Sequence, residues 1–156
     1  MKTEETKFLL EVARLTAKRS KAMRLKVGAV VSDSIGNIIA TGFNGTVRGF
    51  DNEAGEVRSY TKLPFTHWDS QDDPYSVTTN HDLMIHAEQN LITHAARRGI
   101  SIFGGVVSCT HSPCMKCTSL MIQSGITEVV FLEKHNSFEE VHQTYKNYVK
   151  LTHWEV

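Results

Sequence analysis

The stretch that decides the fold is GGVVSCTHSPCMKCTSLMIQSGITEVVFLE, residues 104–133. Its first part, residues 104–110, is a short apolar run that is typical of a buried strand. Residues 113–125 then predict a helix, for which Ser112 is the expected N-cap. A second apolar run at 127–133 predicts another strand. Because strands joined through a helix favour parallel pairing, this stretch predicts an α/β fold.

The residues before this unit add a helix and a hairpin. Residues 3–20 place apolar side chains at helical spacing with charges between them, which indicates an amphipathic helix. Two β-rich runs, 26–33 and 37–44, are joined by a turn and predict antiparallel strands. The following residues, 45–80, are polar and rich in turn formers. We expect a long irregular insertion there, of the kind that is usually functional.

Further elements complete one sheet with helices on both faces. Residues 86–98 predict another helix. Ser137 and Glu140 form the pattern of a capping box for a last helix, and residues 152–156 predict a closing strand. The order of elements predicts a three-layer α/β/α sandwich with a mixed sheet of about five strands. At 156 residues, we expect the whole chain, 1–156, to be a single domain.

The composition is that of an ordinary globular protein, with 40% hydrophobic and 22% charged residues. The 17 basic and 17 acidic side chains cancel, so we expect no nucleic-acid partner. The N-terminus lacks the pattern of a signal peptide, and no run of about 18 apolar residues indicates a membrane span. Three cysteines cannot all pair, which favours a reducing compartment. We therefore expect a cytoplasmic protein without a membrane partner.

Two thiols open the helix at the centre of the quoted stretch. Cys114 and Cys117 form a C-x-x-C motif, which places both sulfurs on one helix face. Unpaired backbone N–H groups in the first turn favour thiolates there. Taken alone, the C-x-x-C motif is as typical of a redox pair, or of half a zinc knuckle, as it is of a catalytic metal site. His86, at the start of its own helix, can converge on the same point. These three side chains predict one catalytic Zn²⁺ with an open fourth position.

A glutamate, Glu88, follows His86 in the sequence HAEQN. Residues two apart in a helix point about 200° away from each other, but at an N-terminus both can address a group beyond the end. We interpret Glu88 as the general base that takes a proton from metal-bound water. A lone H-x-E is a weak signal. H-A-E followed by P-C-x-x-C, however, matches the known signature of the zinc deaminases, in which the glutamate is not a ligand.

From about residue 5 to 135 the sequence resembles the zinc-dependent cytidine/deoxycytidylate deaminase superfamily, and within it the deoxycytidylate (dCMP) deaminases. Three motifs carry the resemblance. The first metal ligand is the histidine of HAEQN, and TGFNG at 41–45 is similar to the family's G-Y-N-G. RSKAMRLKVGA at 19–29 is similar to R-S-x-x-x-R-x-x-V-G-A. The resemblance implies a cytidine deaminase-like fold and hydrolysis of dCMP to dUMP and ammonia.

The resemblance also implies roles for individual residues. A water activated by the zinc attacks C4 of cytosine, while Glu88 passes protons to N3 and to the leaving amine. A cation beside small donors suits a 5′-phosphate, although such a cluster is equally typical of a solvated helix end. Ser20, Lys21 and Arg24 are placed like the residues that bind the phosphate in this family. Asn44 is placed like the asparagine that contacts the sugar. Thr110 and Ser112 are placed like residues that line the base pocket.

Regulation enters through the same resemblance. Enzymes of this family are often hexamers that dCTP with Mg²⁺ activates and dTTP inhibits. The positions of that regulatory site correspond to Gly42, Phe43, Asn44 and Gly45. Phe43 replaces the usual tyrosine and so lacks its hydroxyl.

A second, structural zinc of the kind that some relatives hold is not expected. Those relatives bind it through cysteines in the long loop, and residues 45–80 contain none. His67 and His81 are a poor substitute for such ligands. Cys109, in a predicted strand, is interpreted as a small buried hydrophobic residue.

Two other functions stay open at this point. The first is deamination of another base or nucleotide, such as tRNA adenosine, guanine or dCTP. Neutral net charge weighs against tRNA, and the RSKAMR motif favours a mononucleotide. The second is a non-catalytic zinc module that binds nucleotides. Glu88 weighs against it, because a purely structural site gains nothing from a buried carboxylate beside an open position.

Overall fold

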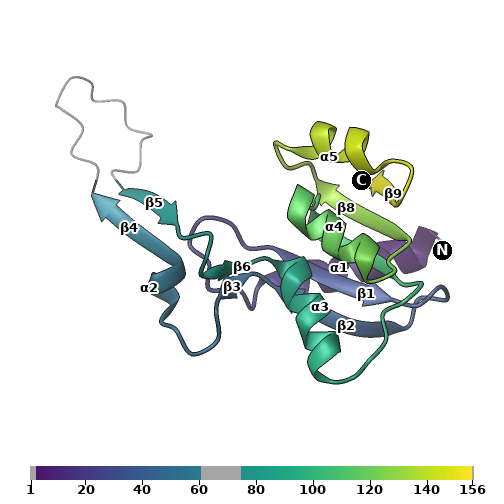
Figure 1. Cartoon of the computed structure of the whole chain (residues 1–156), viewed down its shortest axis with the longest axis horizontal. Coiled ribbons are helices and arrows are strands. Elements are labelled where there is room, and N and C mark those ends of the chain that lie inside the picture. Colours follow the sequence, from purple (N-terminus) through teal and green to yellow (C-terminus); the bar gives the residue numbers. More distant parts are fainter. Residues whose placement is uncertain (1–2, 61–74, 156) are drawn as a thin grey trace.

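The computed structural model describes residues 3–60 and 75–155, and a five-stranded sheet forms its centre. The strand order is β2-β1-β7-β8-β9 (Figure 1). β1 pairs antiparallel with β2 and β7, whereas β7, β8 and β9 are parallel. The elements of this layered body are α1 (Thr3–Ala17), β1 (Gly28–Ser32), β2 (Ile38–Phe43), α3 (Ala87–Arg97), β7 (Val106–His111), α4 (Met115–Gln123), β8 (Glu128–Glu133), α5 (Phe138–Tyr145) and β9 (Lys150–His153).

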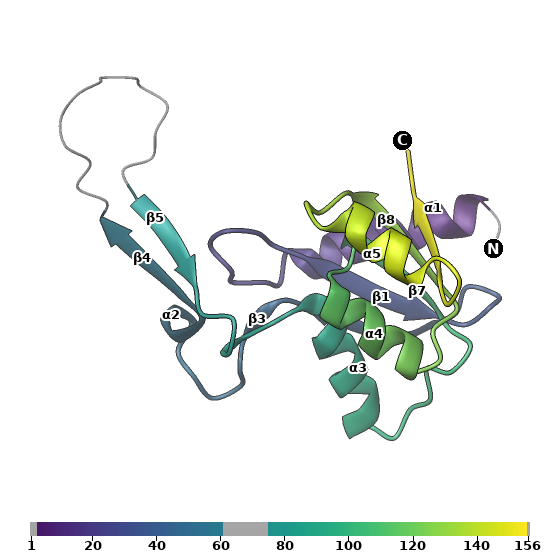
Figure 2. The same ribbon diagram turned by 45° about the horizontal axis from the view of Figure 1, so that its top comes forward.

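Helices cover both faces of this sheet. Along β1, side chains alternate between the faces, as in any strand. Val30 packs in one core cluster with Leu9 and Ala13 of α1, and Val31 belongs to the cluster on the other face with Leu91 of α3. The cluster on that second face also includes residues of α4 and α5. The expected three-layer α/β/α sandwich with a mixed sheet is therefore confirmed (Figures 1 and 2).

The segment expected to be irregular contains paired strands, so that expectation was wrong for its described part. The elements there are β3 (Gly45–Thr46), α2 (Asn52–Gly55), β4 (Glu56–Tyr60) and β5 (Tyr75–Thr79), and β6 (Met84–Ile85) follows the segment. β4 pairs antiparallel with β5, and this hairpin projects away from the sheet (Figure 2). Its sequence gave little signal, because the two strands form a separate two-stranded sheet and do not join the central one. His67 lies outside the described residues, and the single-domain expectation stays a prediction.

Helix boundaries differ from expectation at two caps. Cys114, not Ser112, is the N-cap of α4. Ser112 lies before the helix, where its N–H donates to the Glu133 carbonyl and its hydroxyl accepts from another backbone N–H. Ser137 is the N-cap of α5 but makes no side-chain capping bond, so the capping box is absent. Its hydroxyl instead contacts the ring of His135, with a 2.9 Å separation from Nδ1.

The C-terminal strand begins earlier than expected. β9 spans Lys150–His153, not 152–156, because α5 ends at Tyr145 and a turn follows. α1 is the longest helix in the described ranges at 15 residues. Neither α1 nor any other helix in those ranges is long and apolar enough to cross a membrane.

Gly42 lets α3 approach β2 closely. A Cβ at Gly42 would overlap the Ala87 carbonyl oxygen and lie 2.5 Å from the backbone nitrogen of Leu91. Both neighbours are backbone atoms of α3, which cannot move without shifting the helix start. We therefore expect Gly42→Ala to lower the free energy of unfolding by about 3 kcal/mol, measured by urea denaturation.

The matched control is Gly45→Ala, in the same G-F-N-G motif. No atom lies within 4 Å of the position that a Cβ would take at Gly45. We expect this variant to change the free energy of unfolding by less than about 1 kcal/mol. Equal losses for the two variants would contradict the close approach at Gly42.

Candidate metal and substrate site

One half of the site is built where the chain enters α3. β6, of Met84–Ile85, pairs with β3 and leads the chain in extended form to His86, the N-cap residue. The backbone N–H of His86 donates to Oε1 of Gln89 at 2.9 Å, which fixes the first turn. Because an N-cap residue lies outside the helical geometry, its side chain points beyond the helix end. The imidazole of His86 therefore lies at the N-terminal end of α3.

The other half is the start of α4. Cys114 is the N-cap residue, and Cys117 is in the first turn. Both the N–H and the hydroxyl of Thr118 donate to the Cys114 carbonyl, each at 2.9 Å. These bonds secure the first turn, so the two thiols face the same side. The expected convergence of two helix starts is thus what the structure shows.

The three ligand-type side chains meet. The sulfurs of Cys114 and Cys117 lie 3.6 and 3.5 Å from Nδ1 of His86. All three donor atoms lie within 4.8 Å of one another. In a tetrahedral zinc site, with sulfur at about 2.3 Å and nitrogen at about 2.0–2.1 Å, these donors are about 3.6 Å apart. The donor set and its spacing therefore fit Zn²⁺, and the group could hold such an ion.

Electrostatics within this group favour one thiolate even without a cation. The Cys117 thiol donates to the sulfur of Cys114, and with His86 it lowers the pKa of Cys114 to about 3. The same contact raises the pKa of Cys117, because its proton is held between the sulfurs. The pKa of His86 is raised, chiefly by its contact with Cys114. The cluster thus concentrates negative charge on sulfur, which is the form that binds metal.

Glu88 lies beside the cluster without belonging to it. It is buried, at 4% exposure, in the first turn of α3. Burial raises the pKa of its carboxyl group, and interactions with Cys117 and His86 partly offset this. Cys109 is fully buried in β7, where desolvation raises the pKa of its thiol. It is not among the three clustered ligands, in keeping with its expected place as a small core residue.

A cavity of about 540 Å³ opens onto this cluster. His86, Glu88 and Cys114 are among its lining residues. The other lining residues come from the loop after α1, from the residue after β2, from the start of β4, from the stretch between the end of β5 and the start of α3, and from the ends of β7 and β8 with the residues that follow them. They are Arg24, Leu25, Val27, Asn44, Glu56, Thr79, His81, Met84, Ala87, His111, Ser112, Lys134, His135 and Asn136.

Of the three residues predicted to contact the phosphate, one lines the cavity and two do not. Arg24 lines the cavity, but Ser20 and Lys21 are not among its lining residues. Ser20 is buried; its hydroxyl donates to the Asn44 carbonyl at 2.8 Å and accepts from the Ala22 N–H. Lys21 is exposed. In the described structure Ser20 therefore holds the loop in place.

Asn44 lines the cavity, but its side-chain amide is hydrogen-bonded to the backbone of the same loop. Its Oδ1 accepts from the Val27 N–H, and its Nδ2 donates to the Leu25 carbonyl, both at 2.8 Å. Thr110 does not line the cavity, and its hydroxyl accepts from the Gly28 N–H at 3.2 Å. Ser112 does line it.

The G-F-N-G residues make contacts within the fold. The Arg19 guanidinium lies 4.8 Å from the centre of the Phe43 ring, and the Asn90 amide donates to the Phe43 carbonyl. Gly45 pairs with Ile85 in the β3–β6 ladder. Of the four residues expected to bind a regulatory nucleotide, only Asn44 lines the cavity.

Sequence reasoning missed several cavity residues. Lys134, His135 and Asn136 directly follow β8, and the crevice outside the carboxyl ends of parallel strands is a known place for ligands. That rule could have marked them. Glu56 begins β4 and His81 follows β5, and the sequence did not indicate either of these strands.

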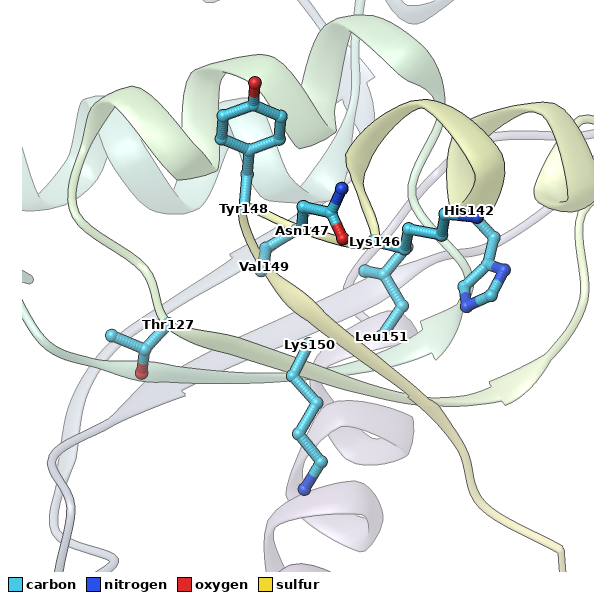
Figure 3. Close-up of a pocket in the computed structure, with 8 residues that line it drawn as sticks. All are labelled: Thr127, His142, Lys146, Asn147, Tyr148, Val149, Lys150 and Leu151. Atoms are coloured by element: carbon cyan, nitrogen blue, oxygen red, sulfur yellow. The ribbon is translucent and has the colours of Figure 1, made fainter.

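A second cavity, of about 350 Å³, lies between the end of α5 and β9 (Figure 3). Tyr148 and Lys150 point in opposite directions from it, and Lys150 pairs with Glu128 at 2.9 Å. None of the expected site residues lines this cavity. The expected site residues that do line a cavity, among them His86, Glu88 and Cys114, line the first one.

Comparison with known proteins decides the family. Residues 3–133 match the model of the cytidine and deoxycytidylate deaminase zinc-binding region. The chain belongs to this deaminase family. The match covers both motifs that supply the clustered ligands, and it confirms the resemblance that they indicated.

Individual members of the deaminase family agree with this. The deoxycytidylate deaminase of Saccharomyces cerevisiae is 30% identical over 142 residues, which are 90% of this chain and 41% of the yeast protein. That of Enterobacteria phage T4 is 32% identical over 82% of this chain and 77% of its own. The dCMP deaminase of cyanophage S-TIM5, solved with dCMP and dUMP, is 30% identical with a TM-score of 0.74 over 99% of both chains. The chain thus spans less than half of the yeast relative.

Proposed function

We propose that this protein is a zinc-dependent hydrolase that converts dCMP to dUMP and ammonia. The observation that carries the proposal is the His86, Cys114 and Cys117 cluster with the buried carboxylate of Glu88 beside it, at the end of a cavity. Relatives of similar length are named deoxycytidylate deaminases, and the S-TIM5 structure contains substrate and product. Both sets of observations support the same reaction.

In this proposal the clustered side chains hold the zinc, and each remaining group has a separate task. A zinc ion bound there supplies Lewis acidity, which lowers the pKa of a bound water from 15.7 to about 7. Glu88 would take one proton from that water and give it to N3. As the oxygen added at C4 becomes a carbonyl, Glu88 would take the second proton from that oxygen and give it to the amine, which leaves as ammonia. Burial raises the pKa of Glu88, which favours a group that both gains and loses a proton near neutral pH.

The rest of the cavity would hold the nucleotide. Arg24 and Lys134 both line it and provide cations for a 5′-phosphate. His111, the last residue of β7, and Ser112, which follows it, also line the cavity, and the base would stack on or bond to them. Lys21, which does not line the cavity, would add positive charge near Arg24 from a greater distance. Ser20, Asn44 and Thr110 would then act by holding the loops around the nucleotide.

Regulation and assembly extend the proposal. The family resemblance of Gly42, Phe43, Asn44 and Gly45 supports activation by dCTP with Mg²⁺ and inhibition by dTTP in a homohexamer. Phe43 lacks the tyrosine hydroxyl, so we expect weaker regulation than in enzymes with G-Y-N-G. Free thiols at the metal site support a reducing compartment such as the cytoplasm.

The direct test is ammonia release from dCMP by the zinc-loaded protein. We expect turnover of dCMP, faster with dCTP and Mg²⁺ and slower with dTTP. Cytidine, dCTP, guanine and a tRNA anticodon stem are assayed beside it. Turnover of one of these in place of dCMP would replace the proposed substrate, and zinc binding without any deamination would favour a non-catalytic module.

A further inference from the structure

A buried carboxylate, Glu56, lies in the wall of the cavity away from the metal cluster. It is the first residue of β4 and is only 4% exposed. Its Oε2 accepts a hydrogen bond from the backbone N–H of Met23. Within the described residues this is the one hydrogen bond of its side chain, and no ion pair involves it. An ionised carboxylate has about four acceptor sites, so Glu56 has acceptor capacity left for a ligand in the cavity.

The other groups in the cavity restrict what that ligand atom can be. Arg24 and Lys134 line the same cavity without pairing to Glu56 and are suited to a phosphate. A phosphate next to Glu56 would be repelled by its charge. The aminated edge of the base must lie at Glu88 for proton transfer. A deoxynucleotide has one other donor, the hydroxyl of its sugar.

We infer that Glu56 binds the 3′-hydroxyl of the nucleotide and is a specificity-determining residue. The inference rests on the proposed function, since it takes the base to lie at Glu88. An acceptor-only carboxylate in a buried wall selects a hydroxyl donor and discriminates against a sugar that lacks one or carries a phosphate there. The bond to Met23 would hold the carboxylate in place and connect the loop after α1 to the β4–β5 arm.

The test compares dCMP with 2′,3′-dideoxycytidine monophosphate, which differs only by the missing hydroxyl. A hydrogen bond to a charged group predicts that wild-type kcat/KM falls about tenfold or more when the hydroxyl is absent. In Glu56→Ala the two substrates should differ by less than about twofold. Glu56→Gln keeps an oxygen for the Met23 N–H and should give an intermediate ratio. Glu53→Gln, an exposed acid one turn earlier, should keep the wild-type ratio.

Each ratio is measured within one variant, so partial unfolding cancels. An equal loss for both substrates in Glu56→Ala, with the wild-type ratio preserved, would show a purely structural residue and overturn the inference. So would a wild-type enzyme that processes both substrates equally. Calorimetric binding of dUMP and its 3′-deoxy analogue supplies a readout without turnover. An inactive wild type whose hydroxyl preference still depends on Glu56 would sink the proposed reaction but keep this inference.

Discussion

Glu88→Gln is expected to bind zinc as the wild type does and to lose deamination of dCMP by at least about 10²–10⁴-fold. Glutamine has nearly the same shape but cannot accept and return a proton. Glu88 is not among the three clustered ligand residues, so the metal content should stay unchanged. Zinc is measured by mass spectrometry and activity by dUMP formation.

The thermal midpoint separates a chemical loss from a folding defect. Burial of Glu88 disfavours its charged form, so a neutral amide of the same size should not lower the midpoint. Glu139→Gln, an exposed acid on α5, serves as the matched control and should keep full activity. Turnover by Glu88→Gln at the rate of this control would rule out the proton-transfer role.

Cys114→Ser is expected to reduce the zinc content from about one ion per chain to about one tenth and to abolish activity. The hydroxyl is a much poorer ligand, and the remaining two donors leave the tetrahedral set incomplete. His86→Ala should behave likewise. Colorimetric zinc titration after dialysis measures the content.

The matched control for the thiol is Cys109→Ala. Cys109 is a fully buried free cysteine that does not belong to the ligand cluster. Its loss costs packing in the core but should leave the zinc content at about one ion per chain. If Cys109→Ala loses zinc and Cys114→Ser keeps it, the ligand assignment is wrong.

The sequence predicted the central sheet and the convergence of His86, Cys114 and Cys117 because both depend on local patterns. The β7–α4–β8 unit shows clear apolar runs around a helix, and a parallel pairing follows from that connection. H-A-E and P-C-x-x-C mark two helix starts by spacing alone. Because α3 and α4 pack on the same face of one sheet, their N-terminal ends can lie close together.

Partners across the fold could not be predicted in the same way. Asn44 was marked by its motif, yet its amide is taken by Leu25 and Val27, and no local pattern indicates those bonds. In the sequence, nothing distinguishes Glu56 from other acidic residues of a polar segment. Its place in the cavity wall depends on β4, which it begins. The strands β4 and β5 pair with each other and not with the central sheet, so they need not carry the apolar runs by which the central strands were predicted.

The position of His86 and Cys114 at two helix starts has a mechanical consequence. They are 28 positions apart in the chain, and an ion shared between them closes that length into a ring. A ring of this kind restricts the unfolded chain as a disulfide does, although it opens whenever the ion is released. Zinc would then act as a reversible clasp, and the availability of the metal would control how firmly α3 and α4 stay together.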